Sequence, residues 1–431
     1  MLKPYNTDIT DIAVVFAHTG IRDYKKNRIY AVAATSLSDT RASKTFESFV
    51  QYPYLTARDR YYSNISKETL VDAPEASVVI AKVKELLRDT EIILTLPYQN
   101  SYEEIQKIFP EKRIVDLAFA VEFFLPHVDS FSPKRLWEYI HRQERKRIYF
   151  AASEITALSI NLIVAICGNE LNDGVLPRAA AIRHYLKKSN TLFGNLFLHF
   201  VNNYEKYFDA LINPRQAPDT ADWHRFLTSV PVKQEIKQEN INKIEPNEKI
   251  RIEKLESLYR GLSQSEKGFS LRASQVEYAK HVAQAINDEA VLTIEAGTGT
   301  GKTQGYLIPV MEYLSQNPDE RIAVSTYTKS LQDQIFQQEI AFIKNANKMY
   351  KDIPISLLKG KSNYICAAKL GHVFDDTWEG AKLLTWLYFV NLTYHYRDAD
   401  GDQTGPRITH YLNKDPFLCQ IQREVSARSG C

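Results

Sequence analysis

The stretch VLTIEAGTGTGKTQGYLIPVMEYL, residues 291–314, decides the fold of the second half of the chain. A short apolar run from Val291 to Ile294 predicts a β-strand, and the apolar residues after Lys302 predict a helix. Between them, glycines at 297, 299 and 301 allow successive backbone amides to curve around an anion at the beginning of that helix. Strand, glycine-rich loop and helix in this order are typical of a nucleotide-binding α/β domain.

The loop matches the phosphate-binding pattern G-x-x-x-x-G-K-[ST] at every position but the first, where Ala296 stands. We expect Lys302 to reach the β- and γ-phosphates of ATP and Thr303 to place its hydroxyl on Mg²⁺. A glycine-rich turn that binds nothing is the competing interpretation, and it leaves the adjoining strand, Lys-Thr pair and helix unexplained. The residues expected around the nucleotide phosphates are Ala296, Gly297, Thr298, Gly299, Thr300, Gly301, Lys302 and Thr303.

The composition predicts a folded protein of several domains. A chain of 431 residues has room for roughly three domains, and 44% hydrophobic with 25% charged residues excludes wholesale disorder. The formal net charge of +2 provides no global basic field, so contacts with nucleic acid must come from local patches. No leader pattern opens the chain, and the apolar run at 158–167 is too short to cross a bilayer. We therefore expect a cytoplasmic protein without a membrane partner.

The N-terminal half alternates strand and helix patterns, and this predicts an α/β domain that opens with three strands. The predicted helix Pro74 to Arg88 shows helical spacing at Val78, Ala81, Val83 and Leu87. The predicted strands are Ile12 to Phe16, Arg28 to Thr35, Thr45 to Val50, Ile92 to Leu96 and Arg113 to Val115, and a further helix begins near Ser101.

A charged stretch separates this domain from the nucleotide-binding segment. Residues 213–256 are rich in Lys, Glu, Gln and Asn, which is typical of a linker or a solvated helix. Beyond them, a helix is expected with Val276, Ala279, Ala283 and Ile286 on its apolar face. The letters NDEA at 287–290 resemble a DEAH box, but they precede the phosphate loop and are interpreted as a helix end and a turn.

The flanks of the phosphate loop resemble superfamily 2 helicases of the DinG/XPD type, in which Ala commonly stands at the position of Ala296. The segment GFSLRASQVEYA at 268–279 is similar to the Q-motif region, and the resemblance implies adenine recognition by Phe269, Arg272 and Gln275. The segment IAVSTYTKSLQDQI at 322–335 resembles the family's strand and loop that hold single-stranded DNA. The residues that this second match implies for the nucleic-acid contact are Ser325, Thr326, Thr328 and Gln332.

The resemblance implies a motor enzyme. Relatives of this type hydrolyse ATP with Mg²⁺ and move 5′ to 3′ on single-stranded DNA, so the implied partner is single-stranded or forked DNA. Such motors need a Walker B Asp-Glu after the phosphate loop and a second RecA-like domain, and neither follows in this sequence. We therefore expect the chain to be an inactive fragment of a longer helicase.

The segment SLLKGKSNYIC at 356–366 resembles the entrance to the insertion domain of this family. In iron–sulfur relatives a Cys at the place of Cys366 is the first of four ligands of a [4Fe–4S] cluster. Cys419 and Cys431 are the further candidate ligands, while Cys167 lies in an apolar run and is expected in a core. The alternative is that the chain follows relatives which keep the NYxC segment without the other ligands.

Residues 12–169 resemble the DnaQ-like 3′–5′ exonucleases, which hold two metal ions with acidic side chains. Where that family has D-x-E-T-T-G, this chain has VFAHTG, so that Val15 and Ala17 replace both carboxylates. Glu103 stands at the expected acid of the second motif, and Tyr149 and Glu154 stand at the His and Asp of the third. These replacements predict a domain that retains the exonuclease fold without its activity.

We accordingly predict an α/β fold, with an RNase H-like exonuclease-type domain followed by a partial RecA-like P-loop domain and the start of a helical insertion. The predicted domains are 1–170 (degenerate exonuclease), 171–256 (helical extension and linker), 257–365 (partial helicase domain) and 366–431 (start of the insertion). The competing hypothesis is a non-enzymatic nucleic-acid-binding or regulatory protein with a relic P-loop. A kinase or transporter is disfavoured because neither explains the segments at 322–335 and 356–366.

Overall fold

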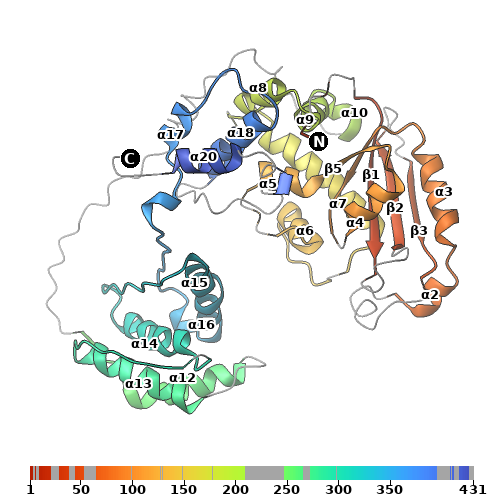
Figure 1. Cartoon of the computed structure of the whole chain (residues 1–431). Coiled ribbons are helices and arrows are strands. Elements are labelled where there is room, and N and C mark those ends of the chain that lie inside the picture. Colours follow the sequence, from red (N-terminus) through yellow and green to blue (C-terminus); the bar gives the residue numbers. More distant parts are fainter. Residues whose placement is uncertain are drawn as a thin grey trace. The chain divides into compact units, whose positions relative to one another are not determined.

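The chain folds into two compact units. Unit 1 comprises Met1–Lys233 together with Lys361–Cys431, and unit 2 comprises Gln234–Gly360, so unit 2 is inserted into the sequence of unit 1. The structure is a computed structural model that describes residues 1–208 and 247–426, except for residues 3–4, 6–8, 21–28, 38–43, 53–64, 99, 127, 129, 148, 177, 266–271, 298, 396–407, 409 and 412–416. Figure 1 shows the elements of both units.

Unit 1 is built around a five-stranded mixed sheet, and each of the five predicted strands is present. The strands are β1 (Ile12–Thr19), β2 (Ile29–Leu37), β3 (Thr45–Phe49), β4 (Ile92–Thr95) and β5 (Arg113–Asp116). Their order is β3-β2-β1-β4-β5, with β1, β2 and β3 antiparallel and β1, β4 and β5 parallel. This arrangement confirms the RNase H-like fold predicted for the N-terminal half.

The helices of unit 1 cover both faces of the sheet. They are α2 (Lys67–Val71), α3 (Ala76–Leu86), α4 (Ser101–Ile108), α5 (Leu117–Phe124), α6 (Pro133–His141), α7 (Ala152–Ala165), which continues into the π-helix η1 (Ile166–Glu170), α8 (Ala179–Ser189), α9 (Leu192–Asn202) and α10 (Tyr204–Phe208). Strand side chains alternate between faces, so β1 turns Val14 and Phe16 towards the core shared with α7 and Val15 and Ala17 towards α3 and α4. In Figure 1, α3 and α7 lie on opposite sides of the sheet.

Helix α3 forms within the predicted range, with a correction to its buried face. Val83 and Leu87 are buried as predicted, whereas Val78 is 46% exposed and Ala81 is exposed. Val79, which the sequence analysis did not place on this face, is buried in their stead. Cys167 is fully buried in the η1 turn, as expected for a core residue, and burial raises the pKa of its thiol.

The C-terminal segment of the chain packs on the exonuclease-type domain. Its helices are α17 (Ala367–His372), α18 (Gly380–His395) and α20 (Phe417–Val425), after the short 3₁₀ turn η4 (Lys361–Asn363). Eleven consecutive residues of α18, from Leu383 to Thr393, are buried. Asn391 donates its side-chain N–H to the Phe123 carbonyl at 2.8 Å, so α18 is joined to the end of α5 by a buried hydrogen bond. The insertion role predicted for residues 366–431 remains a prediction.

Two acidic residues of α5 and its cap also hold the C-terminal segment. Asp116 caps α5 by accepting the Ala118 backbone N–H at 2.8 Å, and its other carboxylate oxygen accepts the Tyr411 hydroxyl at 3.0 Å. Glu122 accepts the backbone N–H of Ile408 at 2.7 Å. Asp116 is fully buried and Glu122 nearly so, and an unpaired carboxylate at either place would be costly.

Unit 2 consists of helices in its described residues. They are α12 (Ile252–Ser265), α13 (Ala273–Asn287), α14 (Lys302–Gln316), α15 (Lys329–Gln334), the π-helix η2 (Ile335–Glu339), α16 (Ile340–Ala346) and the 3₁₀ turn η3 (Lys348–Tyr350). Val276 and Ala279 pack into one core with Leu307 and Ile308 of α14. Helix α13 ends at Asn287, and Glu289 follows at φ 49°, which confirms the predicted helix end and turn.

The prediction of a strand at Val291 to Ile294 is wrong. These residues have no strand assignment, and Val291 and Leu292 are 102% and 44% exposed. The strand implied by the helicase resemblance before Ser325 is likewise not formed. A strand requires a neighbour that completes its hydrogen-bond ladder, and within the described part of unit 2 no segment pairs with either run.

One helix among the described residues is long and apolar enough to span a membrane. It runs from Ala152 to Glu170, across α7 and η1, and half of its apolar window is buried. Its buried residues include Ile155, Leu158 and Leu162, which lie in the same core as β1 and β2. Its apolar character is therefore accounted for by packing on the sheet.

Candidate functional site

The phosphate loop has the backbone geometry that its glycines allow. Gly299 and Gly301 adopt φ values of 76° and 79°, in the left-handed region that side chains with a Cβ disfavour. Gly301 is the residue before α14, so the loop ends directly at the beginning of a 15-residue helix. The Thr300 hydroxyl donates to the Gly297 carbonyl at 3.0 Å and closes the turn. Thr298 lies outside the described residues.

Lys302 lies across this loop. Its Nζ donates to the carbonyl oxygens of Ala296 and Gly297 at 2.8 and 2.9 Å, and the side chain is exposed. The ammonium group is thus held on the solvent side of the turn, beside the first amides of α14. Thr303 is half-buried, and its hydroxyl is hydrogen-bonded to that of Tyr306. A cationic group, a hydroxyl and a helix N-terminus therefore meet at one turn, as binding of a phosphate with its metal ion requires.

Gln275 is the Q-motif residue that the structure places against the loop. It is only 4% exposed, and its side-chain N–H donates to the Gly301 carbonyl at 3.0 Å. A Cβ added to Gly301 would lie 2.7 Å from the side-chain carbonyl carbon of Gln275. Gln275 therefore contacts the loop backbone directly. Arg272 is exposed immediately before α13, and Phe269 lies outside the described residues.

Gln304 is a loop-supporting residue that the sequence analysis missed. Its side-chain N–H donates to Glu339 at 3.0 Å, and its backbone carbonyl accepts the buried Tyr259 hydroxyl at 2.9 Å. Its side-chain oxygen lies 3.4 Å from the Gln275 amide. Burial raises the pKa of Tyr259, so its hydroxyl stays a neutral donor. The only sequence signal for a role of Gln304 is its position directly after Lys302 and Thr303.

The residues implied for nucleic-acid contact follow one another around the beginning of α15. Thr328 caps this helix by accepting the Leu331 backbone N–H at 3.3 Å, and the Thr326 hydroxyl donates to the Thr328 carbonyl at 3.3 Å. Ser325 is exposed, and Gln332 is half-buried and donates to the Leu358 carbonyl at 3.3 Å. These hydroxyls lie near the surface, where they are accessible to a phosphate backbone.

An ion pair joins the segment 356–366 to helix α15. Lys359 is 7% exposed, and its Nζ lies 3.2 Å from a carboxylate oxygen of Asp333. Cys366 follows at the start of α17 and is half-buried, and its backbone N–H donates to Val425 at 2.7 Å. Cys366 is thus brought beside the end of α20, the helix that contains Cys419. The Cys419 side chain and Cys431 lie outside the description, so the predicted cluster ligands stay a prediction.

Aromatic side chains occupy the face of the sheet on which α7 lies, at the end of β1. The His18 ring stacks on Tyr30 at 5.3 Å and on Tyr149 at 5.6 Å, and its Nε2 is 2.8 Å from the Phe150 carbonyl. Phe16 and His18 point towards α7, whereas Val15 and Ala17 point into the core with α3 and α4. Val15 and Ala17, which stand at the positions of the first-motif acids, are therefore packed in an apolar core, and Phe16 and His18 on the other face are not acidic either.

The glutamates at the second and third motifs have other partners. Glu154 accepts the Ala151 backbone N–H at 2.7 Å with one oxygen and pairs with Arg145 at 2.9 Å with the other, at the beginning of α7. Partial burial opposes ionisation, but these two donors outweigh it and lower the pKa of Glu154. Glu103 is exposed on α4. In the described part of the chain, no three His, Cys, Asp or Glu side chains are grouped as metal ligands.

Part of this sequence is similar to known helicases. Residues 275–373 match the model of the DEAD/DEAH box helicases. The chain is 44% identical over 117 residues to the ATP-dependent DNA helicase YoaA of Haemophilus influenzae, a match that covers 27% of this chain and 17% of the relative. It is 29% identical over 201 residues to the 3′-5′ exonuclease DinG of Bacillus subtilis, covering 45% of this chain and 21% of the relative.

The chain spans about a fifth or less of the length of these relatives. Among solved structures, Escherichia coli exonuclease I in complex with an oligonucleotide aligns with 90% of this chain and 99% of that chain, at 11% identity and a TM-score of 0.32. A 3′-exonuclease that recognises a histone mRNA stem-loop aligns with 39% of this chain and 85% of that chain, at 13% identity and a TM-score of 0.31. Residues 275–373 are therefore similar to DEAD/DEAH box helicases, the chain is similar to YoaA and DinG over part of its length, and unit 1 has the RNase H-like strand order.

Proposed function

We propose that this chain provides the ATP-binding segment of a cytoplasmic, ATP-dependent DNA helicase of the DinG/XPD type, acting 5′ to 3′ on single-stranded or forked DNA. The single observation that supports this most strongly is the phosphate loop, where two left-handed glycines lead directly into α14 beside the Lys302 ammonium. Its neighbour Gln275 contacts the same loop. In this proposal Lys302 binds the terminal phosphates and Thr303 holds Mg²⁺.

The remaining predicted residues take supporting roles in this proposal. Gln275, Arg272 and Phe269 recognise adenine, and the segment from Ser325 to Gln332 holds the strand by its phosphates without reading bases. ATP hydrolysis by such motors also requires a Walker B acid and a second motor domain, and this proposal assigns neither role to a described residue of the chain. An iron–sulfur cluster that includes Cys366 is kept as part of the proposal.

We propose that the exonuclease-type domain binds or positions nucleic acid without cleaving it. Two-metal hydrolysis requires carboxylates on both sides of the scissile phosphate. At the first-motif positions β1 has Val15 and Ala17 in place of carboxylates, and both oxygens of Glu154 already accept hydrogen bonds. DNA degradation in Mn²⁺ that disappears in a Glu154→Gln variant would contradict this part of the proposal.

Titration with MgATP tests the nucleotide site in the 431-residue chain. A Lys302→Ala variant removes one charge-assisted interaction worth about 1.5–3 kcal/mol, so the dissociation constant should rise roughly 10- to 100-fold. Lys348→Ala, which removes an exposed lysine from the same unit, is the matched control and should leave the affinity unchanged. Magnesium-independent or undetectable binding by the unchanged chain would instead favour the non-enzymatic protein with a relic P-loop.

A further inference from the structure

A concentrated basic segment covers α6 and the residues directly after it in unit 1, and none of the roles assigned above uses it. Residues 134–147, here called the basic segment, contain six Lys or Arg and two Glu, a net charge of +4. The whole chain carries +2, so the rest of the molecule is slightly acidic and this segment is its local positive field. Local patches of this kind provide the electrostatic attraction for nucleic acid.

The fold presents this charge to solvent. Helix α6 ends at His141, and Arg142 follows in the left-handed region at φ 55°. Residues 143–147 and 149–151 are not helical. Arg142, Lys146 and Arg147 are exposed. Like charges at this density repel, and the chain must be held in place by other contacts for them to stay together.

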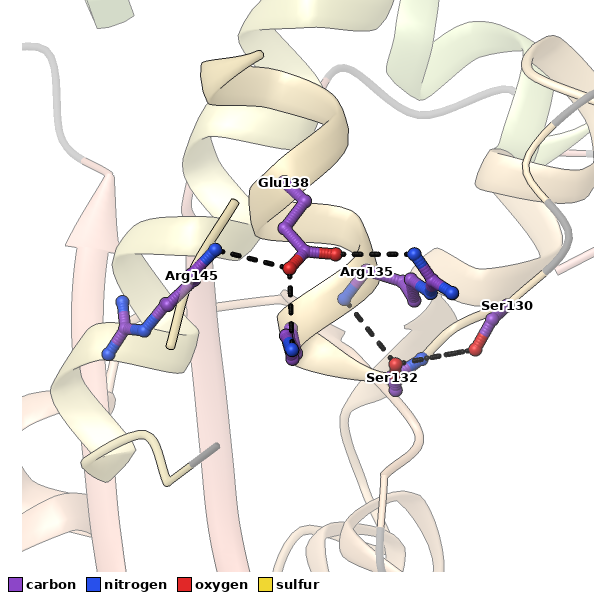
Figure 2. A network of polar contacts seen from close by, with 6 residues as sticks. Ser130, Ser132, Arg135, Glu138 and Arg145 are labelled. Atoms are coloured by element: carbon purple, nitrogen blue, oxygen red, sulfur yellow. Dashed lines mark hydrogen bonds and ion pairs between the residues drawn. The ribbon is translucent and has the colours of Figure 1, made fainter. Parts of the chain in front are cut away.

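Contacts of Glu138 hold the basic segment in place (Figure 2). One of its carboxylate oxygens accepts the Arg145 backbone N–H at 3.1 Å, and it also pairs with Lys134 and Arg135 at 3.6 and 3.5 Å. The Arg145 amide, together with these two cations, lowers the pKa of Glu138 and keeps it charged. Glu138 thus joins the start of the segment to Arg145 near its end. The positive charge of the exposed Arg142, Lys146 and Arg147 is not neutralised by this contact.

Aromatic rings alternate with these cations. Trp137 stacks on the exposed His141 ring at 4.1 Å, and the Arg145 guanidinium lies 3.8 Å from the Phe150 ring centre. Arg147 lies 5.6 Å from the ring centre of the half-buried Tyr149. Basic side chains along a path with aromatic faces beside it are the combination that binds single strands without sequence preference.

We propose that the basic segment is a second binding surface for single-stranded nucleic acid, in the unit that does not contain the phosphate loop. Arg142, Lys146 and Arg147 contact the phosphates, and bases stack near His141 and Tyr149. The same Tyr149 packs against His18, the residue after Ala17, and Ala17 replaces a carboxylate of the first exonuclease motif. The surface therefore holds a strand without cutting it, and this goes beyond the ATP-dependent function proposed for unit 2.

The test is binding of fluorescein-labelled dT20 to the 431-residue chain, without nucleotide, followed by anisotropy across a range of salt concentrations. The charge-reversal variant Arg142→Glu/Lys146→Glu/Arg147→Glu should bind at least about tenfold more weakly at low salt. The slope of log affinity against log salt should become shallower by about 2, since each lost phosphate contact contributes roughly 0.7 on single strands. The neutral Gln variant at the same three positions should show an intermediate loss.

A matched control changes the same number of charges elsewhere on the same unit. Lys82, Lys84 and Arg88 are exposed on and directly after α3, and their reversal to Glu should leave dT20 affinity and salt slope close to those of the unchanged chain. Far-UV circular dichroism verifies that both variants are folded. Equal losses in the two variants would show general charge attraction and overturn the assignment.

Two further results would also overturn it. The first is a basic-segment variant that binds dT20 normally but loses binding of poly-glutamate, which would identify an acidic protein partner instead. The second is a complete loss of dT20 binding on changing Thr328 and Gln332 with no loss in the basic-segment variant. Because the Lys302 titration reports on MgATP alone, failure of the strand-binding surface and failure of the nucleotide site are distinguishable.

Discussion

Gly301 is the residue on which the phosphate loop depends most directly. Its φ of 79° is strained for any residue with a Cβ, and its α-carbon faces the buried Gln275 amide. The loop backbone and the Q-motif glutamine can approach one another only because this position lacks a side chain. A change here therefore affects both the loop and its support.

Gly301→Ala is expected to destabilise unit 2 by about 1–2 kcal/mol, the cost of a left-handed residue with a Cβ, and to weaken MgATP binding. Gly261→Ala is the control, because nothing lies within 4 Å of a Cβ at Gly261 in helix α12. That control should raise stability by roughly 0.5–1 kcal/mol. Thermal unfolding and MgATP titration measure both effects, and a stable, fully binding Gly301→Ala variant would contradict the geometry.

Among the helices, α7 is stabilised by side-chain contacts in its first turn. Glu154 returns to the Ala151 backbone N–H and pairs with Arg145, so one side chain joins the helix start to the basic segment. This arrangement satisfies an N–H that the helix itself leaves without a partner. It also gives Glu154 a structural role at the start of the helix.

Glu154→Gln should lower the stability of unit 1 by less than about 1 kcal/mol at neutral pH, since the side chain is part-exposed and the ion pair is screened. The folded-state pKa of Glu154 lies below its usual 4.5, so the charge contribution is present above pH 4.5 and is lost as the pH falls through the folded value. Urea unfolding followed by circular dichroism should show the largest difference at pH 7. A difference that grows on acidification would disprove the assignment.

The elements of the exonuclease-type domain are predictable because their signals are local. The runs at Ile12, Ile29 and Ile92 are β-branched and bounded by turn residues, and each forms a strand. The run at Val291 has the same character and forms none, because a ladder partner is a non-local requirement that composition does not encode. For the same reason, the sequence alone did not show which face of β1 lies beside Glu154.

At the level of the whole molecule, residues 361–426 complete the core of the N-terminal domain. Helix α18 is apolar on nearly every side, so its sequence predicts burial but not the partner. The partner is α5 with α8, reached across more than two hundred residues of intervening chain. No pattern in the sequence analysis pointed to this packing, whereas the phosphate loop was recognisable because its function requires contiguous residues.

Removal of residues 361–431 should unfold or aggregate unit 1. Each large buried side chain contributes about 1.5–3 kcal/mol, and α18 alone buries several, against a typical total stability of about 5–15 kcal/mol. Replacing residues 234–360 by a short Gly-Ser linker should instead leave a soluble unit 1. Sedimentation and circular dichroism of the two deletion variants decide between these outcomes, and a soluble, folded 1–360 chain would refute the shared core.

The buried bond between Asn391 and the Phe123 carbonyl joins residues that lie on either side of the inserted unit. A single peptide-bond cleavage between the two units would therefore not release unit 2, because the two pieces would stay associated as a complementing pair. Unit 2 is in this sense an insertion whose two ends are both anchored in unit 1. A mechanical load placed on unit 2 must therefore reach unit 1 through two chain connections rather than one.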